Sequence, residues 1–135
     1  MNLVVAASTQ PVAATKVYFA WILSKADVFV TNGGYGGVNQ AMSFGVPLVC
    51  AGLTEDKADV NVRVGWSEVG INLETDKPTP QVLRDAVRTV LDTDSYRLRA
   101  SLMAEEFRMT DTRGEILRAI NAADRPSRAA LMPAK

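Results

Sequence analysis

A chain of 135 residues, 47% of them hydrophobic and 22% charged, has the length of one domain and enough apolar side chains to bury a core. Fifteen basic and fifteen acidic residues cancel, so the composition gives no broad electrostatic attraction to nucleic acid or to an anionic membrane. The single cysteine excludes an internal disulfide, and no apolar run approaches the roughly 20 residues of a membrane span.

The first part of the chain predicts two short strands. Leu3–Ala6 is a continuous apolar run, and Val17–Phe19 suits a second strand after a polar turn. Aromatic side chains gather in this segment, at Tyr18, Phe19 and Trp21. Aromatic residues in such a position belong more often to a core than to a ligand site.

The centre of the sequence predicts a strand, a glycine loop, a helix and a further strand. Val28–Thr31 and Leu48–Ala51 are the two apolar runs. Four glycines within residues 32–37 permit positive φ and close backbone approach, and Gly45–Pro47 ends the helix. The expected buried side of that helix comprises Val38, Ala41, Met42 and Phe44. Free N–H groups at its start predict an anion site, with a phosphate as the first ligand to consider.

This centre also has a plainer interpretation, in which the glycines only let a helix pack close to its sheet. Neither the dinucleotide fingerprint G-x-G-x-x-G nor the phosphate loop G-x-x-x-x-G-K-[ST] is present. Cys50 lies inside an apolar strand, so we expect a buried small hydrophobic residue and not a nucleophile.

The rest of the chain alternates helices with one short strand. Acidic residues in Thr54–Asp56 mark the start of a helix that ends near Gly70, and Ile71–Leu73 suits a strand. The expected apolar side of that helix comprises Val60, Val64 and residues 66–69. Three amphipathic helices follow, from Thr79-Pro80 (Leu83, Ala86, Val87, Val90, Leu91), after Asp94 (Tyr96, Ala100, Met103, Phe107) and from about Thr112 (Ile116, Leu117, Ile120). Residues 125–135 contain two prolines and no periodicity, which predicts a disordered tail.

Short apolar strands that alternate with helices predict an α/β fold, a doubly wound parallel sheet covered on both faces. We count about five strands, near residues 3, 17, 28, 48 and 71, in one domain over residues 1–124. Such a sheet binds its ligand outside the carboxyl ends of its strands. The glycine loop and the turn at Thr54–Lys57 both follow strands, so we expect them to converge on one crevice.

The segment TNGGYGGVNQAMSFGVPLV, followed by TEDK, resembles the donor-sugar signature of the GT-B glycosyltransferases of the macrolide and UDP-glycosyltransferase group. That family shows Thr-His-Gly-Gly, a Glu eight residues after the His, Gly-Val-Pro, and later an Asp-Gln pair. Five anchors agree here in their spacing. The resemblance extends over residues 3–123 and only over the C-terminal half of the family, which implies an incomplete C-terminal GT-B domain with a Rossmann-like sheet.

The resemblance implies roles for nine residues. Asn32 stands where a His normally donates to the nucleotide diphosphate, and Gln40 where a Glu accepts from ribose hydroxyls. Asp56 aligns with the Asp that binds sugar hydroxyls, although with Glu55 it could equally compensate a helix dipole. The implied donor-binding set is Asn32, Gly33, Gly34, Gly36, Gly37, Gln40, Glu55, Asp56 and Lys57. In the family the segment around Tyr18 lies beside the base, so Tyr18, Phe19 or Trp21 could stack on it.

The resemblance also implies an activity: transfer of a hexose from a UDP- or dTDP-sugar to a hydroxyl of a small molecule or lipid, without a metal or other cofactor. In the family the N-terminal half binds the acceptor and supplies the base, usually a His, whereas this chain has no His. We therefore assign no catalytic residue and expect the chain alone to be inactive, so that it needs an acceptor-binding subunit or self-association. The alternatives are a non-catalytic nucleotide-binding or vestigial module from a truncated gene, and a protein that binds another phosphorylated ligand. The sequence shows no signal peptide, which favours the cytoplasm.

In the family, a strand and a helix precede the strand at Leu3–Ala6, and the sheet order is 3-2-1-4-5-6. Without them the strand at Val28–Thr31 would lose its neighbour and leave an unpaired edge. Each buried N–H or C=O group left without a partner costs on the order of 1–3 kcal/mol. We therefore expect Leu3–Ala6 to pair directly with Val28–Thr31, unless another chain supplies the absent strand.

Overall fold

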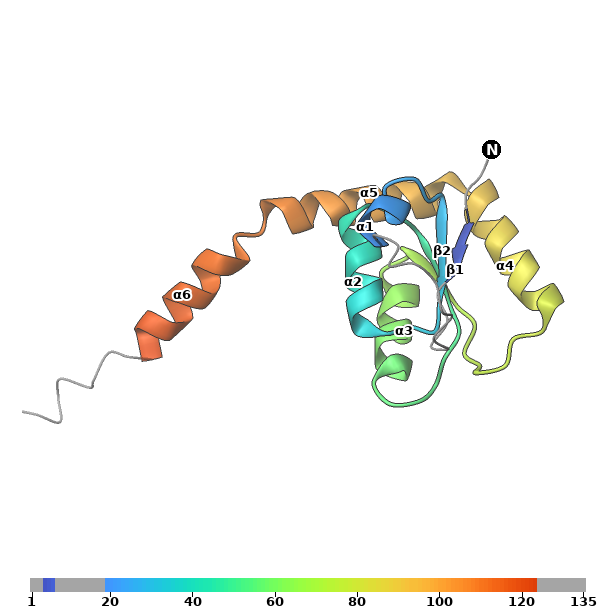
Figure 1. Ribbon diagram of the computed structural model, residues 1–135, viewed down its shortest axis with the longest axis horizontal. Coiled ribbons are helices and arrows are strands. Elements are labelled where there is room, and N and C mark those ends of the chain that lie inside the picture. The colour runs from blue at the N-terminus through green and yellow to red at the C-terminus, as the bar shows by residue number, and fades with distance from the viewer. Residues whose placement is uncertain (1–3, 7–18, 124–135) are drawn as a thin grey trace, which may run out of the picture.

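The computed structural model describes the backbone of residues 4–6 and all of residues 19–123. Strands and helices alternate along the first half, and three helices follow (Figure 1). The elements are β1 (Val4–Ala6), α1 (Phe19–Leu23), β2 (Val28–Thr31), α2 (Tyr35–Ser43), β3 (Leu48–Cys50), α3 (Lys57–Trp66), β4 (Gly70–Asn72), α4 (Pro80–Asp92), α5 (Asp94–Met109) and α6 (Thr112–Ala123). None of the helices in these ranges is both long enough and apolar enough to cross a membrane.

The described strands form one parallel sheet in the order β1-β2-β3-β4. β1 pairs directly with β2, with Val4 opposite Val28 and Ala6 opposite Val30, so the expected closure of the sheet is confirmed. The order follows the chain without the reversal of a 3-2-1-4-5-6 sheet.

The predicted strand at residues 17–19 is wrong at Phe19, which begins α1. Residues 17 and 18 lie outside the described part, so four strands are described where about five were predicted. Phe19 and Leu23 stand one helical turn apart and contribute to the same core, with Leu23 buried and Phe19 packed against its edge. The ring of Phe19 meets that of Phe29 edge-on, with centroids 5.4 Å apart. This apolar run therefore follows a helical period and not the two-residue period of a strand.

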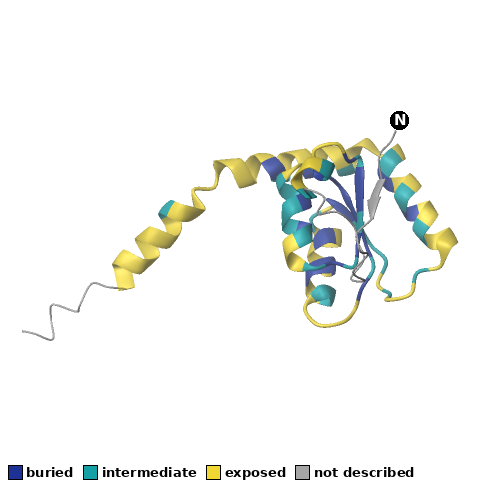
Figure 2. Cartoon of the chain, in the orientation of Figure 1, coloured by how far each residue is buried: buried dark blue, intermediate teal, exposed yellow. Residues whose placement is uncertain are grey.

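Helices cover both faces of the sheet, as the α/β prediction requires (Figures 1 and 2). Successive strand residues point to opposite faces. Phe29 and Leu48 pack with side chains of α2 and α3 on one face, while Val28 and Val49 pack with those of α4 on the other. All three residues of β3 are completely buried, so this strand lies at the centre of the core.

Local sequence signals explain where two of the helices begin and end. α2 stops at Gly45, whose φ of +69° turns the chain so that the N–H of Val46 bonds back to the carbonyl of Ala41 at 3.0 Å. α4 begins at Thr79-Pro80 as predicted, with the Thr79 hydroxyl accepting from the N–H of Val82 at 3.3 Å. Both boundaries agree with the residue types that the sequence analysis used.

The C-terminal helices are less buried than their periodicity predicted. α5 packs against α2 through Ala100 and Ala104, but α6 has no buried residue and points away from the rest of the chain (Figures 1 and 2). Several side chains predicted to face a core are exposed instead: Phe44, Trp66, Phe107, Ile116, Leu117 and Ile120. A helical period identifies an apolar face, but it does not say whether another element covers that face. The predicted tail at residues 125–135 lies outside the described residues.

Candidate functional site

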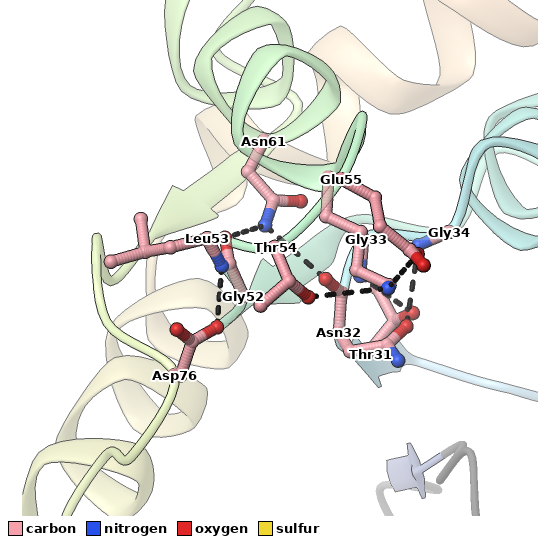
Figure 3. Close-up of polar contacts among 11 residues, drawn as sticks. Thr31, Asn32, Gly33, Gly34, Gly52, Leu53, Thr54, Glu55, Asn61 and Asp76 are labelled. Atoms are coloured by element: carbon pink, nitrogen blue, oxygen red, sulfur yellow. Dashed lines mark hydrogen bonds and ion pairs between the residues drawn. The ribbon is translucent and has the colours of Figure 1, made fainter.

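Two loops meet at the carboxyl edge of the sheet (Figure 3). The first follows β2 and contains Asn32, Gly33 and Gly34, and the second follows β3 and leads to α3. They touch so closely that a Cβ added at Gly52 would lie 2.2 Å from the carbonyl oxygen of Asn32. The convergence that parallel strands predicted is therefore present in the structure.

The loop after β2 is held by its own side chains. The N–H of Gly33 donates to the Thr31 hydroxyl at 3.2 Å, and the N–H of Gly34 donates to Oδ1 of Asn32 at 3.3 Å. Gly33 has a φ of +91°, a conformation that glycine adopts readily. Because only the amide oxygen can accept a hydrogen bond, the contact with Gly34 fixes the side chain of Asn32. Its Nδ2 donor is thereby kept for other partners.

The start of α2 presents unpaired backbone donors. Gly34 is its N-cap and supplies no side-chain hydrogen bond, and the N–H of Val38 is the first to bond back, to the carbonyl of Gly34 at 3.0 Å. The N–H groups of residues 35–37 thus have no acceptor within the helix. No acidic residue stands in this first turn, and a Cβ at Gly36 would meet nothing within 4 Å. The positive end of the helix dipole therefore has no carboxylate in its own first turn and has open space beside Gly36, which suits an anion.

Gly37 and Gln40 complete the predicted set on α2. A Cβ at Gly37 would lie 3.7 Å from the Phe29 ring, so this glycine turns toward the core. Gln40 is half-buried and follows Gly36 by four residues, which places both on the same face of the helix.

The loop after β3 carries an ion pair. Nζ of Lys57 lies 2.7 Å from Oε2 of Glu55 and 3.4 Å from the Thr54 hydroxyl. The side chain of Lys57 is only 16% exposed, whereas that of Glu55 is 76% exposed and stands on a residue with a φ of +58°. The hydrogen bond with Glu55 raises the pKa of Lys57, and the same bond, with the charge of Lys57, lowers the pKa of Glu55. Both groups are therefore charged at neutral pH.

The start of α3 differs in charge from the start of α2. Asp56 is the N-cap of α3, is exposed and makes no capping hydrogen bond, and Asp59 stands in the first turn. Two carboxylates at this helix end compensate its dipole and would repel a phosphate. Their free oxygens can accept hydrogen bonds from hydroxyl groups. The two helix starts at this edge thus suit different ligand groups.

The sequence analysis missed Asn61, which joins the two loops (Figure 3). This side chain is completely buried, and its Nδ2 donates to the carbonyl of Gly52 at 3.0 Å and to that of Asn32 at 3.4 Å. One signal could have revealed it. Asn61 is an amide on the buried side of a helix, next to Val60 and three residues before Val64.

The cysteine and the two described aromatic residues that the sequence singles out lie in β3 and α1, not in the loops. Cys50 is buried as predicted, and burial raises the pKa of its thiol to about 12, which suppresses the nucleophilic thiolate. Phe19 belongs to the core, Trp21 is 65% exposed on α1, and Tyr18 lies outside the described residues. Within residues 19–123, no group of three or more His, Cys, Asp or Glu side chains gathers as metal ligands.

A hollow of about 290 Å³ lies between α2 and α3 and not at the meeting point of the loops. It is mainly apolar, with Met42, Val60 and Met103 in its wall, and it reaches the glycine-loop end only at Tyr35. We regard the loop edge as the candidate site because the polar donors and acceptors converge there.

Comparisons with known proteins identify this architecture. The family described as the erythromycin biosynthesis protein CIII-like, C-terminal domain, matches residues 9–123. The 4'-demethylrebeccamycin synthase of Lentzea aerocolonigenes is 44% identical over 90 residues, which are 67% of this chain and 21% of that protein. UDP-glycosyltransferase 2 of Phaeomoniella chlamydospora is 43% identical over 93 residues, 69% of this chain and 20% of that protein. The chain thus spans about a fifth of these curated relatives.

Solved structures of glycosyltransferases are also similar to this chain. The glycotransferase of kitacinnamycin is similar with a TM-score of 0.64 and 31% identity, over 69% of this chain and 24% of that one. The spinosyn forosaminyltransferase has a TM-score of 0.72 over 90% of this chain and 35% of that one, and at 17% identity it supports the fold alone. The chain therefore has the fold of the C-terminal part of a GT-B glycosyltransferase, and the fold prediction is confirmed.

Proposed function

This chain belongs to the family of erythromycin biosynthesis protein CIII-like C-terminal domains, and we propose that it binds a nucleotide-diphosphate hexose, with UDP or dTDP as the nucleotide. It would act as the donor-binding half of a hexosyltransferase whose acceptor is a hydroxyl of a small molecule or lipid. The observation that carries the proposal is the uncapped, carboxylate-free start of α2 beside the glycine loop. An acceptor-binding domain would face this edge.

The diphosphate is assigned to the loop after β2. Backbone N–H groups of residues 35–37 point out of the helix start, and Nδ2 of Asn32 adds a side-chain donor. Glycine at positions 34 and 36 leaves this approach free of side chains. Hydrogen bonds from these donors to an ionised phosphate are charge-assisted and hence stronger than neutral ones.

The hydroxyl groups of the donor are assigned to the remaining residues. Gln40 shares a helix face with Gly36, so its amide oxygen can accept from a ribose hydroxyl next to the diphosphate. Asp56, an exposed carboxylate without a capping bond, would accept from the hexose. Lys57, the residue after Asp56, would contribute positive charge to the same site. Glu55 holds Lys57 in place from the same loop.

A second candidate is a non-catalytic nucleotide-binding module. The chain contains no His, so for either candidate the family's usual base would have to come from the acceptor-binding half. The two candidates share the donor site and differ in the chemistry that follows. Adding the acceptor-binding half of a related glycosyltransferase separates them: transfer to an acceptor supports the first, and nucleotide binding without transfer supports the second.

The test of the donor site compares UDP with a UDP-hexose by calorimetry. Losing a hydrogen bond to a charged partner typically costs about 1.5–3 kcal/mol, or about a 10- to 150-fold loss of affinity. Asp56→Ala should impose this loss on the UDP-hexose and leave UDP binding almost unchanged. Asp59→Ala, which removes the other acidic residue at the same helix start, is the matched control and should spare both ligands. An equal loss for both ligands in Asp56→Ala would mean that Asp56 acts only on its helix.

A further inference from the structure

Asn61 is a polar side chain in a position that an apolar one would normally occupy. It is completely buried on α3, between Val60 and Val64 of the same core. A buried amide is costly unless its hydrogen bonds are made. Here the bonds join segments that are distant in sequence, because Asn61 is 29 residues from Asn32 and 9 from Gly52.

The orientation of the Asn61 amide is fixed by its partners. Both partners are backbone carbonyl oxygens, which only accept, so Nδ2 must face them. Oδ1 consequently points the other way, and it has no hydrogen-bond partner within the described residues. A Cβ added at Gly33 would lie 1.9 Å from this oxygen. Asn61 therefore fills the space that a side chain at position 33 would need.

Glycine at two positions makes this arrangement possible. Gly33 leaves room for Asn61, and Gly52 lets the carbonyl of Asn32 approach to where a Cβ would stand. The Nδ2 of Asn61 then donates to a backbone carbonyl in each of the two loops. The three residues interlock, so that the loop after β2 cannot shift against the loop after β3 without breaking a bond of Asn61.

We propose that Asn61 is a positioning residue of the donor site: it fixes the anion-binding loop against the loop that carries Asp56. This inference rests on the proposed function, since it deepens the account of the same site. Asn61 does not touch the donor. It sets the separation between the groups of one loop that would donate hydrogen bonds to the phosphates and the Asp56 carboxylate of the other loop, which would accept hydrogen bonds from the sugar. A nucleotide sugar must engage both groups at once, so this separation controls how well it fits.

The test uses a nearly isosteric change. In Asn61→Asp an ionised carboxylate would face two carbonyl oxygens and could donate to neither. Protonation returns one donor, so the binding defect should shrink as the pH falls. We expect UDP affinity to drop at least tenfold at pH 8 and to recover in part at pH 5. Asn61→Ala should bind UDP weakly at both pH values.

Asn72→Asp is the matched control, because Oδ1 of Asn72 accepts from the N–H of Glu74 at 3.0 Å and a carboxylate can do the same. This variant should bind UDP like the parent at both pH values. The ionisable groups of the second loop and its neighbour, Glu55, Asp56, Lys57 and Asp76, are present in every variant. Their titration therefore cancels in the ratio of variant to parent affinity. Parent-like affinity in Asn61→Asp at pH 8 would overturn the proposal, as would a tenfold defect that does not change with pH.

A second measurement does not depend on nucleotide binding. If Asn61→Asp is unfolded at pH 8, Asn61→Ser replaces it, because a serine hydroxyl is too short to reach both carbonyls. Amide exchange should become at least tenfold faster relative to α4 in Asn61→Ser at Gly33, whose N–H donates to the Thr31 hydroxyl, and at Leu53, whose N–H donates to the Asp76 carboxylate. Unchanged exchange at both amides would refute the positioning role. A parent chain that binds neither UDP nor dTDP would refute the proposed function instead.

Discussion

Gly36 is the position where stability and ligand affinity should change in opposite directions. It is the second residue of α2, and a Cβ there would meet nothing within 4 Å, so the fold can accept a side chain. Glycine in a helix is less stable than alanine by about 0.5–1 kcal/mol. Gly36→Ala should therefore stabilise the chain by up to that amount, and Gly36→Val by less because valine is β-branched.

The same side chain should weaken nucleotide binding. It would occupy the open space through which a phosphate reaches the N–H groups of residues 35–37. Loss of one charge-assisted hydrogen bond costs about 1.5–3 kcal/mol, which corresponds to about a 10- to 150-fold loss of UDP affinity. Valine should have the larger effect, because its branched Cβ excludes more of the approach.

Urea unfolding measures the stability, and calorimetry with UDP measures the affinity. Gly65→Ala provides the matched control on α3, where the added Cβ would lie in ordinary contact, 3.6 Å from that of Asn72. It should gain stability and keep the UDP affinity of the parent. The reasoning fails if Gly36→Val is as stable as the parent or more so and still binds UDP equally well.

Further predictions concern the core, the cysteine and the last helix. Leu48→Ala, at a completely buried position of β3, should lower the free energy of unfolding by about 2–5 kcal/mol in urea titrations, and a smaller loss would mean that the site collapses around the cavity. Burial raises the pKa of the Cys50 thiol to about 12, so its contribution to stability is complete below about pH 9 and is lost as the pH rises towards 12. A thiol reagent at pH 8 should accordingly react slowly with the native chain and quickly in urea. Serine at Ile116, Leu117 and Ile120 should change the free energy of unfolding by less than about 0.5 kcal/mol at each position, because all three are exposed.

The central part of the fold was predictable because its signals are local. The apolar run at Val28–Thr31 coincides with β2, and Gly45 ends α2 through its positive φ. Thr79 and Pro80 begin α4 by the expected capping bond. Each of these residues fixes its own backbone, so the surrounding structure adds little to what its type implies.

The sequence predictions were wrong or incomplete where contacts between distant parts of the chain determine the structure. The run at residues 17–19 suited a strand, but Phe19 and Leu23 serve the core from a helix. Trp66 follows the predicted apolar side of α3 and is nevertheless 86% exposed, although Val64 and Val69 on either side of it in the sequence are buried. Asn61 was overlooked because its partners are two backbone carbonyls in loops that are distant in sequence, and the residues around Asn61 do not identify them. Family resemblance supplied the donor-binding roles, and those remain predictions.

We expect Glu55 and Lys57 to have different roles in donor binding, because their charges and exposures differ. A nucleotide diphosphate is strongly negative, and on the proposed function Asn32 would offer it an uncharged donor where the resemblance places a His. The start of α2 supplies about half a positive charge by its dipole, so a further cation is needed nearby. We propose Lys57 as that cation, because its side chain is largely enclosed, whereas the Glu55 carboxylate is mostly in water. On donor binding we expect Glu55 to turn away into solvent, while Lys57 would keep its place and face the phosphates. In this proposal Glu55 holds Lys57 in position before the donor arrives, and Lys57 is the member of the pair that would contact the donor.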